Sequence, residues 1–254
     1  MRETVPQALK DFFAAHPRLA LAFSGGVDSA YLLYAASACG CDVAAYCVKS
    51  PFQPGFELDD ARRLAESLGA EMRVIEADAL ADADVRANPA NRCYYCKRFI
   101  FTTLINRAHA GGYDTVIDGT NASDDAGDRP GMKALRELNV LSPLRLCGVT
   151  KAQIREYSRR AGLFTWDKPA YACLATRVPA GEPITLDKLR RVEGAEAALF
   201  RLGFNDFRVR LFHEAARLQF PAAQFEPAAR RRVEIRDALK PYFDVIMIDT
   251  ADRG

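Results

Sequence analysis

Three groups of residues in this chain have the types and spacing of chemical sites. The first is SGGVDS at 24–29, which lies between the apolar runs 19–23 and 30–34. Paired glycines let a backbone approach an anion, and the N–H groups that open the next helix add donors and a favourable dipole. Ser24 and Ser29 add hydroxyls. The segment has neither the Lys of a Walker A loop nor GxGxxG spacing, so we predict another type of phosphate-binding turn, with an ordinary glycine turn as the alternative.

The second group consists of cysteines. NRCYYCK at 91–97 places Cys93 and Cys96 three residues apart, and Cys173 stands four residues before Arg177. A zinc knuckle would need a further CxxC or a His pair, whereas an iron–sulfur site could combine the CxxC with a distant third cysteine. A cysteine near a cation in a loop can be a reactive thiolate. Unconnected, unreactive thiols are the alternative.

The third group is a set of arginines in DFRVRLFHEAARLQF at 206–220. Alternation places Arg208 and Arg210 on one face of a strand, and Arg217 follows on the next β-run. Guanidinium groups spaced in this way suit bidentate binding of phosphate. A solvated strand face is the alternative.

Composition limits the class of protein. The chain has 254 residues, 35 of them basic and 33 acidic, and a net charge of +2 does not indicate a nucleic-acid partner or a polybasic membrane anchor. No apolar stretch approaches the ~18 residues of a membrane span, and residues 1–4 do not open a signal peptide. We expect a cytoplasmic protein without membrane or nucleic-acid partners. An odd count of seven cysteines argues against a disulfide framework, and we expect buried, inert thiols at Cys39, Cys41, Cys47 and Cys147.

The elements that position the first two groups alternate between strand and helix. Candidate strands lie at 18–23, 42–48, 71–76, 114–118 and 139–142. Candidate helices lie at 28–39, 57–68, 94–110, 131–138 and 151–161, the last with a capping box of Thr150 and Gln153. This alternation predicts an α/β fold, a parallel sheet with helices on both faces. Ligands of such sheets bind outside the carboxyl ends of the strands.

Residues 163–184 interrupt the alternation and contain three prolines within 169–183. Beyond them we predict helices at 186–201 and 228–239 and β-runs at 206–212, 216–220 and 243–249. The chain therefore divides into a nucleotide-binding domain at 1–165, a linker with Cys173 at 166–184, and a small α+β domain at 185–254.

In this setting SGGVDS resembles the loop of the PP-loop ATP pyrophosphatases, whose fold is of the adenine nucleotide alpha hydrolase type. Those enzymes cleave ATP between the α- and β-phosphates, adenylate a carboxylate or carbonyl oxygen, and hold pyrophosphate on the loop. The resemblance implies an ATP site at Ser24, Gly25, Gly26, Asp28 and Ser29, with Asp28 ordering the loop or its Mg²⁺.

Four segments together resemble the ATP-dependent sacrificial sulfur transferases that build the nickel-pincer nucleotide of lactate racemase. They are SGGVDS, NRCYYCK, DGTNASDDAGDRPGMKAL (118–135) and ACLATRVPAGEPIT (172–185). The resemblance implies that carboxylates of a pyridinium biscarboxylate mononucleotide are adenylated and that Cys173 attacks. The C–S bond of the cysteine then breaks, which leaves a thiocarboxylate product and dehydroalanine in the protein. A homo-oligomer is also implied, with a hexamer as one option.

The resemblance extends to residues outside the loop. Arg208, Arg210 and Arg217 match a segment that binds the phosphate of the substrate, which gives the small C-terminal domain a role in substrate binding and oligomerisation. Lys97 and Arg177 each stand near a motif cysteine, and we expect them to stabilise negative charge around the adenylate.

The stretch after the strand at 114–118 is rich in Asp and Asn, which is also ordinary turn chemistry. The resemblance implies that Asp118 and Asn121 contribute to the ATP site and makes Asp128 a candidate metal ligand. Asp124 and Arg129 lie in the same stretch without an assigned role.

Two sources of sulfur stay open. Either Cys173 is consumed, or Cys93, Cys96 and Cys173 hold a 4Fe-4S cluster whose fourth iron carries an extra sulfide. The CxxC favours the cluster, because the sacrificial chemistry gives it no role. Two other functions are alternatives: a tRNA thiolase of the PP-loop superfamily, against which the balanced charge argues, and a non-enzymatic nucleotide and iron–sulfur sensor.

Overall fold

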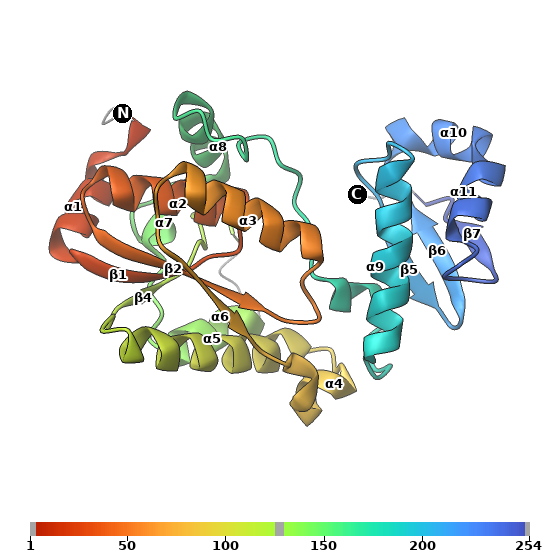
Figure 1. The fold of residues 1–254 in the computed structure, drawn as a ribbon, viewed down its shortest axis with the longest axis horizontal. Coiled ribbons are helices and arrows are strands. Elements are labelled where there is room, and N and C mark those ends of the chain that lie inside the picture. The colour runs from red at the N-terminus through yellow and green to blue at the C-terminus, as the bar shows by residue number, and fades with distance from the viewer. Residues whose placement is uncertain (1–3, 125–129, 252–254) are drawn as a thin grey trace. The chain divides into compact units, whose positions relative to one another are not determined.

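The structure is a computed structural model that describes residues 4–124 and 130–251. The chain forms two compact units. Unit 1 comprises Met1–Ala79 and Asn91–Ala170, and unit 2 comprises Leu80–Ala90 and Tyr171–Gly254. Each unit has its own sheet (Figure 1).

The sheet of unit 1 confirms the predicted parallel α/β fold. Its strands are β1 (Arg18–Ala22), β2 (Asp42–Lys49), β3 (Met72–Glu76) and β4 (Val116–Ile117), in the order β3-β2-β1-β4. All three pairings are parallel. The strand predicted at 139–142 is instead an isolated bridge between Leu141 and Ile117, because the chain turns into a short helix at Pro143.

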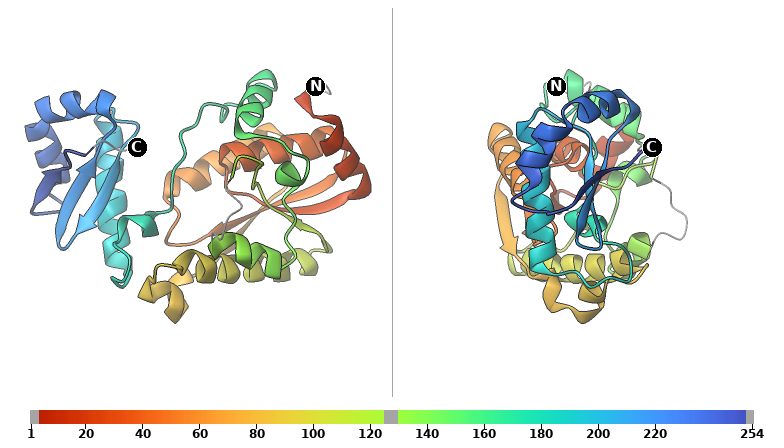
Figure 2. Two further views of the ribbon diagram at one scale, coloured as in Figure 1. Left: turned by 180° about the vertical axis from the view of Figure 1, so that it is seen from behind. Right: turned by 90° about the vertical axis from the view of Figure 1, so that its right-hand side faces the viewer.

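Helices cover both faces of this sheet, with α2 and α3 on one side and α5 and α6 on the other (Figures 1 and 2). The helices of unit 1 are α1 (Gln7–Ala15), α2 (Val27–Ala38), α3 (Gly55–Ser67), α5 (Arg92–Ala110), α6 (Pro130–Glu137), α7 (Pro143–Leu146) and α8 (Lys151–Arg160). The predicted capping box at the start of α8 is present, with Thr150 and Gln153 each bonded to the other's backbone.

Strand β1 is buried on both faces, and its alternation divides the core in two. Leu19 and Leu21 belong to a cluster with residues of α2 and α3, whereas Ala20 belongs to a cluster with Leu104 of α5. Because burial on both faces fixes the register of this central strand, the turn that follows its carboxyl end is held in place.

The sheet of unit 2 has three strands in the order β5-β6-β7. They are β5 (Arg208–Phe212), β6 (Ala215–Gln219) and β7 (Ile246–Ile248), with β5 and β6 antiparallel and β6 and β7 parallel. A two-residue turn joins β5 to β6, and His213 takes φ +53° there. The helices are α4 (Ala83–Ala87), η3 (Leu174–Arg177, a 3₁₀ helix), α9 (Leu186–Arg201), α10 (Ala222–Arg230) and α11 (Arg232–Leu239); a short 3₁₀ helix, η2 (Ala79–Ala81), spans the boundary.

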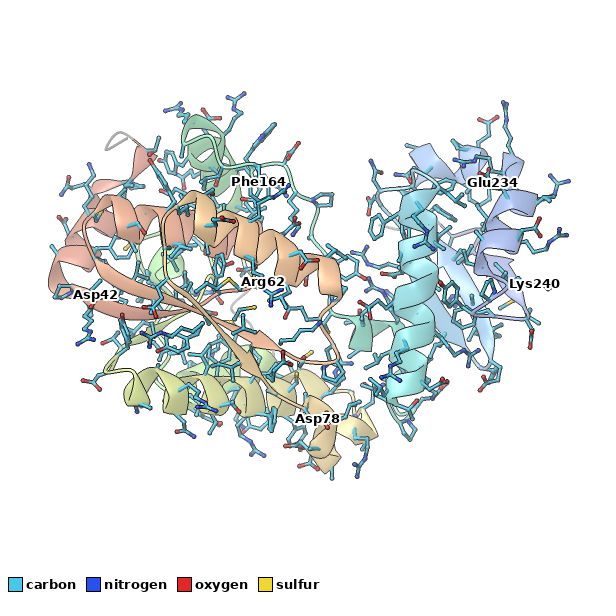
Figure 3. All side chains as sticks on the ribbon, viewed as in Figure 1. Asp42, Arg62, Asp78, Phe164, Glu234 and Lys240 are labelled. Atoms are coloured by element: carbon cyan, nitrogen blue, oxygen red, sulfur yellow. The ribbon has the colours of Figure 1, made fainter. Side chains whose placement is uncertain are left out.

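Two features of unit 2 differ from the predictions. The helix predicted at 228–239 is two helices, which separate at Arg231, and α10 begins earlier and contains Pro227. The charged side chains of Glu234, on α11, and of Lys240, just after this helix, are exposed on the surface of unit 2 (Figure 3).

The other difference is that residues 80–90 belong to unit 2. The Asn88 amide donates to the Pro179 carbonyl at 2.8 Å, and the Ile184 N–H donates to the Arg86 carbonyl at 2.9 Å. These bonds tie α4 to the segment that leads into α9. Within the described ranges, no helix is long and apolar enough to cross a membrane.

Candidate functional site

The phosphate loop, residues 24–29, follows β1 at the carboxyl edge of the sheet and leads into α2. The loop is closed by its own hydroxyls. The Ser24 and Ser29 Oγ atoms lie 3.1 Å apart, the Gly26 N–H donates to Ser24 Oγ at 3.3 Å, and Ser29 Oγ donates to the Gly26 carbonyl at 3.2 Å. The N-terminal N–H groups of α2 therefore lie beside the exposed Ser24, and this arrangement favours the binding of an anion.

The two glycines of the loop have different roles. Gly25 has φ +70°, and a β-carbon there would lie 2.8 Å from Ala61 Cβ of α3. Gly26 has φ −78°, and a β-carbon there would meet only Ser24 Oγ at 3.4 Å. The fold requires a glycine at Gly25, whereas at Gly26 it leaves space that an anion can use.

Asp28 opens α2 and is paired with a lysine from α8. Lys151 Nζ lies 2.8 Å from each carboxylate oxygen of Asp28. Burial raises the pKa of the Asp28 carboxyl, and the hydrogen bond and charge of Lys151 oppose this shift. The nearby Asp124 carboxylate adds a smaller rise through its like charge. The loop therefore carries a carboxylate whose charge is already balanced within the protein.

The loop after β4 lies against the phosphate loop. A β-carbon on Gly119 would come within 3.0 Å of the Ser29 backbone nitrogen. Asp118 is buried and accepts hydrogen bonds from Ser142 Oγ at 2.6 Å and Thr120 Oγ1 at 2.5 Å. Asn121 is also buried and accepts from the Ser123 N–H. Asp118 and Asn121, both predicted for the ATP site, thus follow β4 at the carboxyl edge of the sheet and hold the shape of this loop.

The CxxC lies in the first turns of α5. Cys93 is exposed and Cys96 is half-buried, and their spacing places both on one side of the helix. Lys97 packs with its stem near Gly131 of α6, and its ammonium lies 6.0 Å from the centre of the Phe101 ring.

Cys173 is in unit 2, at the N-terminal end of η3. The Cys173 carbonyl accepts from the Thr176 N–H at 3.0 Å and from Thr176 Oγ1 at 2.8 Å. Arg177 ends this turn and is fully buried, with Nε 2.7 Å from Glu196 Oε1 of α9. The same Glu196 oxygen accepts the Val209 N–H of β5 at 3.0 Å, and Tyr171 donates to the other oxygen. The Arg177–Glu196 ion pair thus fixes the cysteine turn against the sheet.

The three predicted arginines lie on one face of the β5–β6 ladder, and we call Arg208, Arg210 and Arg217 the arginine face. The register places Arg210 directly opposite Arg217. Arg210 donates to the Thr176 carbonyl at 2.7 Å and to Gln219 at 2.6 Å. Burial lowers the pKa of both Arg208 and Arg210, and the charge of Arg177 lowers it further.

Arg217 has weaker partners than its neighbours on this face. Its Nε lies 3.4 Å from an Asp249 oxygen, but among the described residues this buried N–H makes no hydrogen bond. Like charges directly opposite in a ladder repel each other. The arginine face is therefore arranged to gain stability when an anion binds.

Within residues 4–124 and 130–251, no three or more His, Cys, Asp or Glu side chains are grouped so that they could hold a metal ion. Cys93 and Cys96 belong to unit 1 and Cys173 to unit 2. Asp128 and Arg129 lie outside the described residues.

The prediction of four buried, inert thiols is only partly right. Cys47 is buried, which raises the pKa of its thiol to about 11. Cys41 and Cys147 are half-buried, and burial raises the pKa of the Cys41 thiol to about 11 as well. Cys39 is exposed, because it caps the end of α2 where the chain leaves the core.

Two residues of these sites escaped the sequence interpretation. Lys151 stands in the first turn of α8, where a positive charge opposes the helix dipole. Glu196 is a carboxylate within the apolar run GAEAALF of α9. A charge that opposes a helix dipole, or one that stands in an otherwise apolar run, is the signal that could have identified these residues.

The sequence of this chain is similar to those of several known proteins. A family model described as asparagine synthase matches residues 1–103. An uncharacterised protein of Synechocystis is 40% identical over 227 residues, which cover 89% of this chain and 85% of the relative. The pyridinium-3,5-bisthiocarboxylic acid mononucleotide synthase of Lactiplantibacillus plantarum is 34% identical over 225 residues, which cover 88% of this chain and 80% of the relative. A tRNA-specific 2-thiouridylase of Pseudothermotoga lettingae is 25% identical over 187 residues, with coverage of 59% of this chain and 54% of the relative.

Proposed function

Because the chain belongs to the family of the pyridinium-3,5-bisthiocarboxylic acid mononucleotide synthases, we propose that it uses ATP to replace carboxylate oxygen by sulfur on a pyridinium mononucleotide. The observation that carries the proposal is the phosphate loop. Its hydroxyls and open helix N-terminus suit the pyrophosphate that leaves when ATP adenylates a carboxylate.

Adenylation assigns roles to unit 1. A carboxylate oxygen of the substrate attacks the α-phosphorus of ATP, the bond to the bridging oxygen breaks, and pyrophosphate leaves. The phosphate loop holds the phosphates in line, which is the main contribution a protein makes to such a transfer. Mg²⁺, when bound, neutralises charge on the phosphates. Asp28 and Asp124 are the described carboxylates that fit it, since Mg²⁺ takes one or two carboxylates beside substrate phosphates.

Sulfur transfer assigns a role to Cys173. Its thiolate attacks the adenylated carbonyl carbon, AMP leaves, and a thioester forms. Loss of the Cα proton of Cys173 to a base and cleavage of its Cβ–S bond then give the thiocarboxylate and dehydroalanine. Arg208, Arg210 and Arg217 bind the phosphate of the mononucleotide in this proposal. Lys97 and Arg177 are proposed to stabilise the negative charge that develops at the adenylate. Arg177 does so indirectly, because it positions the turn that carries Cys173.

A cluster-bound sulfide is the second candidate source of sulfur. Cys93 and Cys96, on one side of the α5 N-terminus, suit a pair of adjacent thiolate ligands. A 4Fe-4S cluster with one open iron needs a third thiolate, for which Cys173 is the candidate. The described residues contain no assembled group of three ligands, so we derive no step through a cluster.

The function is tested by incubating the chain anaerobically with ATP, Mg²⁺ and the pyridinium biscarboxylate mononucleotide. We expect pyrophosphate release that requires this substrate, together with a thiocarboxylate product. Nicotinamide mononucleotide, which carries an amide and no carboxylate on its ring, is the matched control and should release none. Release that is equal with both nucleotides, or absent with both, contradicts the proposal.

The intact mass of the same protein distinguishes the two sources. Consumption of Cys173 predicts that the chain loses the mass of one H₂S and that Cys93→Ala keeps one round of transfer. The cluster predicts bound iron and sulfide, an unchanged mass after reaction, and loss of iron in Cys93→Ala, Cys96→Ala and Cys173→Ala.

A tRNA thiolase is the alternative, supported by the partial similarity to a 2-thiouridylase. Binding to phosphate backbones falls steeply with salt, so a titration with bulk tRNA at two salt concentrations tests it. Submicromolar, salt-sensitive binding would favour the thiolase, and weak binding at both concentrations would favour the mononucleotide.

A further inference from the structure

The Asp28–Lys151 ion pair stands where a nucleotide and its metal would meet. Asp28 lies in the first turn of α2, directly after the glycines of the phosphate loop. Its two carboxylate oxygens both accept from the single ammonium of Lys151, at 2.8 Å each. The lysine thus saturates the side of the carboxylate that it faces.

The backbone of Lys151 is held by hydrogen bonds, whereas its side chain is partly exposed. The Lys151 N–H donates to Ser123 Oγ at 3.0 Å, and the Thr150–Gln153 capping box fixes the start of α8. The side chain is about one-third exposed at 35%. A lysine is a flexible point charge with three rotatable donors, so it can exchange one anionic partner for another without movement of the helix.

Two other charged residues act on Asp28. Asp124 acts on Asp28 as a like charge, and Arg155 of α8 acts as an opposite charge. No group of three metal-binding side chains is present in the described ranges, so protein ligands alone are few. Mg²⁺ in such sites depends on substrate phosphates to complete its oxygen ligands. A divalent cation and Lys151 would therefore compete for the same carboxylate.

We propose that Lys151 holds the place of a divalent cation on Asp28, and that the metal gains this carboxylate only when nucleotide phosphates draw the ammonium away. This inference rests on the proposed ATP-dependent function. A triphosphate carries more negative charge than one carboxylate, so it attracts the ammonium more strongly. Metal and nucleotide then bind cooperatively, and each raises the affinity of the other by the same factor. Lys151 is thus a positioning residue that couples the two ligands.

The test measures metal binding without turnover. Mn²⁺ is titrated into nucleotide-free protein at pH 8, and free Mn²⁺ is read by electron paramagnetic resonance. We expect weak binding to the unaltered chain and binding about tenfold tighter to Lys151→Met, within the range typical of coupling between sites. Arg18→Met is the matched control: it removes one positive charge from an ion pair with Asp42, at the opposite edge of the sheet, and should not change Mn²⁺ binding.

Two further measurements make the result decisive. Lys151→Arg keeps the charge and should keep Mn²⁺ binding weak, and Lys151→Gln replaces the Met variant if that one does not fold.

In the unaltered chain, Mn²⁺ should strengthen binding of α,β-methylene-ATP, and the analogue should strengthen binding of Mn²⁺ equally. Equal Mn²⁺ affinity in the unaltered chain and Lys151→Met, or no effect of Mn²⁺ on the analogue, overturns the inference. Neither result removes the proposed function, whose failure is seen separately as absent pyrophosphate release.

Discussion

Two regions of this chain present groups suited to anions, and they differ in chemistry. The phosphate loop of unit 1 uses hydroxyls and backbone N–H groups, and its one carboxylate is balanced by Lys151. The arginine face of unit 2 gathers three full positive charges, two of them directly opposite each other. The hydroxyls of the first are bonded within the loop, whereas the second sets Arg210 directly opposite Arg217, whose buried Nε makes no hydrogen bond among the described residues.

This difference fits two kinds of anion. A loop whose hydroxyls are already bonded within the loop binds an anion mainly through the open N–H groups of the helix N-terminus, which suits a leaving group that must also depart. Crowded guanidinium groups, with pKa values that burial lowers, gain the most from a phosphate that brings two negative charges. The comparison therefore predicts that changes in the loop act on the fold and on turnover, and that changes on the arginine face act mainly on ligand affinity.

The largest effect is expected beneath the arginine face, at the Arg177–Glu196 pair. Arg177→Met leaves the Glu196 carboxylate buried without its ionic partner, which costs roughly 3–5 kcal/mol. Hydrogen exchange followed by mass spectrometry should show faster exchange in β5 and η3, with no change in β1. Glu226→Gln, which breaks an exposed pair with Arg230, is the control and should have almost no effect. Unchanged exchange in β5 would mean that the pair does not support this face.

The two loop glycines give the next largest effect. Gly25→Ala places a side chain at φ +70°, which costs roughly 1–2 kcal/mol, and its contact with Ala61 costs roughly 1–3 kcal/mol more. Gly26→Ala should leave the free energy of unfolding nearly unchanged and still abolish pyrophosphate release, because its β-carbon occupies ligand space. Urea unfolding and a pyrophosphate assay on both variants separate the two effects. Full release from Gly26→Ala would place the phosphates elsewhere.

Much of unit 1 could be predicted because its signals are local. A strand, a glycine turn and a helix at 18–38 follow from apolar runs and turn residues, and the Thr150–Gln153 box follows from a four-residue pattern. The same-face placement of Arg208 and Arg210 needs only the alternation of a strand.

The remaining features depend on contacts between distant residues, which local patterns do not encode. The grouping of 80–90 with unit 2 rests on hydrogen bonds between Asn88 and a segment ninety positions later. Lys151 reaches Asp28 across 123 positions of sequence, and Glu196 reaches Arg177 from a different helix. Periodicity shows that such charges are unusual but not which partner they have.

A smaller effect is expected when the arginine face loses a ligand contact. Arg210→Ala removes a charge-assisted hydrogen bond to the substrate phosphate, worth roughly 1.5–3 kcal/mol or about ten- to a hundredfold in affinity. Arg208→Ala should act in the same direction. Arg210→Lys keeps the charge without the planar fork and should lose less. Calorimetric titration with the pyridinium mononucleotide and, separately, with ATP measures this, and an equal loss of ATP affinity would contradict the assignment.

The smallest effect, and the sharpest contrast between the two regions, is expected for Arg217→Gln without ligand. The change relieves repulsion with Arg210, worth roughly 0.2–1 kcal/mol, and also removes the 3.4 Å pair with Asp249, worth roughly 0–1 kcal/mol. These terms oppose each other, so hydrogen exchange in β6 should barely change.

Ser29→Ala, by contrast, breaks hydrogen bonds that the empty loop already makes, and should cost roughly 0.5–1.5 kcal/mol without any anion. Inorganic phosphate, matched with NaCl for ionic strength, should then protect β6 in the unaltered chain more than in Arg217→Gln, because ligand that binds only the folded state adds to its stability. A clear loss of stability in ligand-free Arg217→Gln would show that this arginine supports the fold, and the two regions would then not differ as argued.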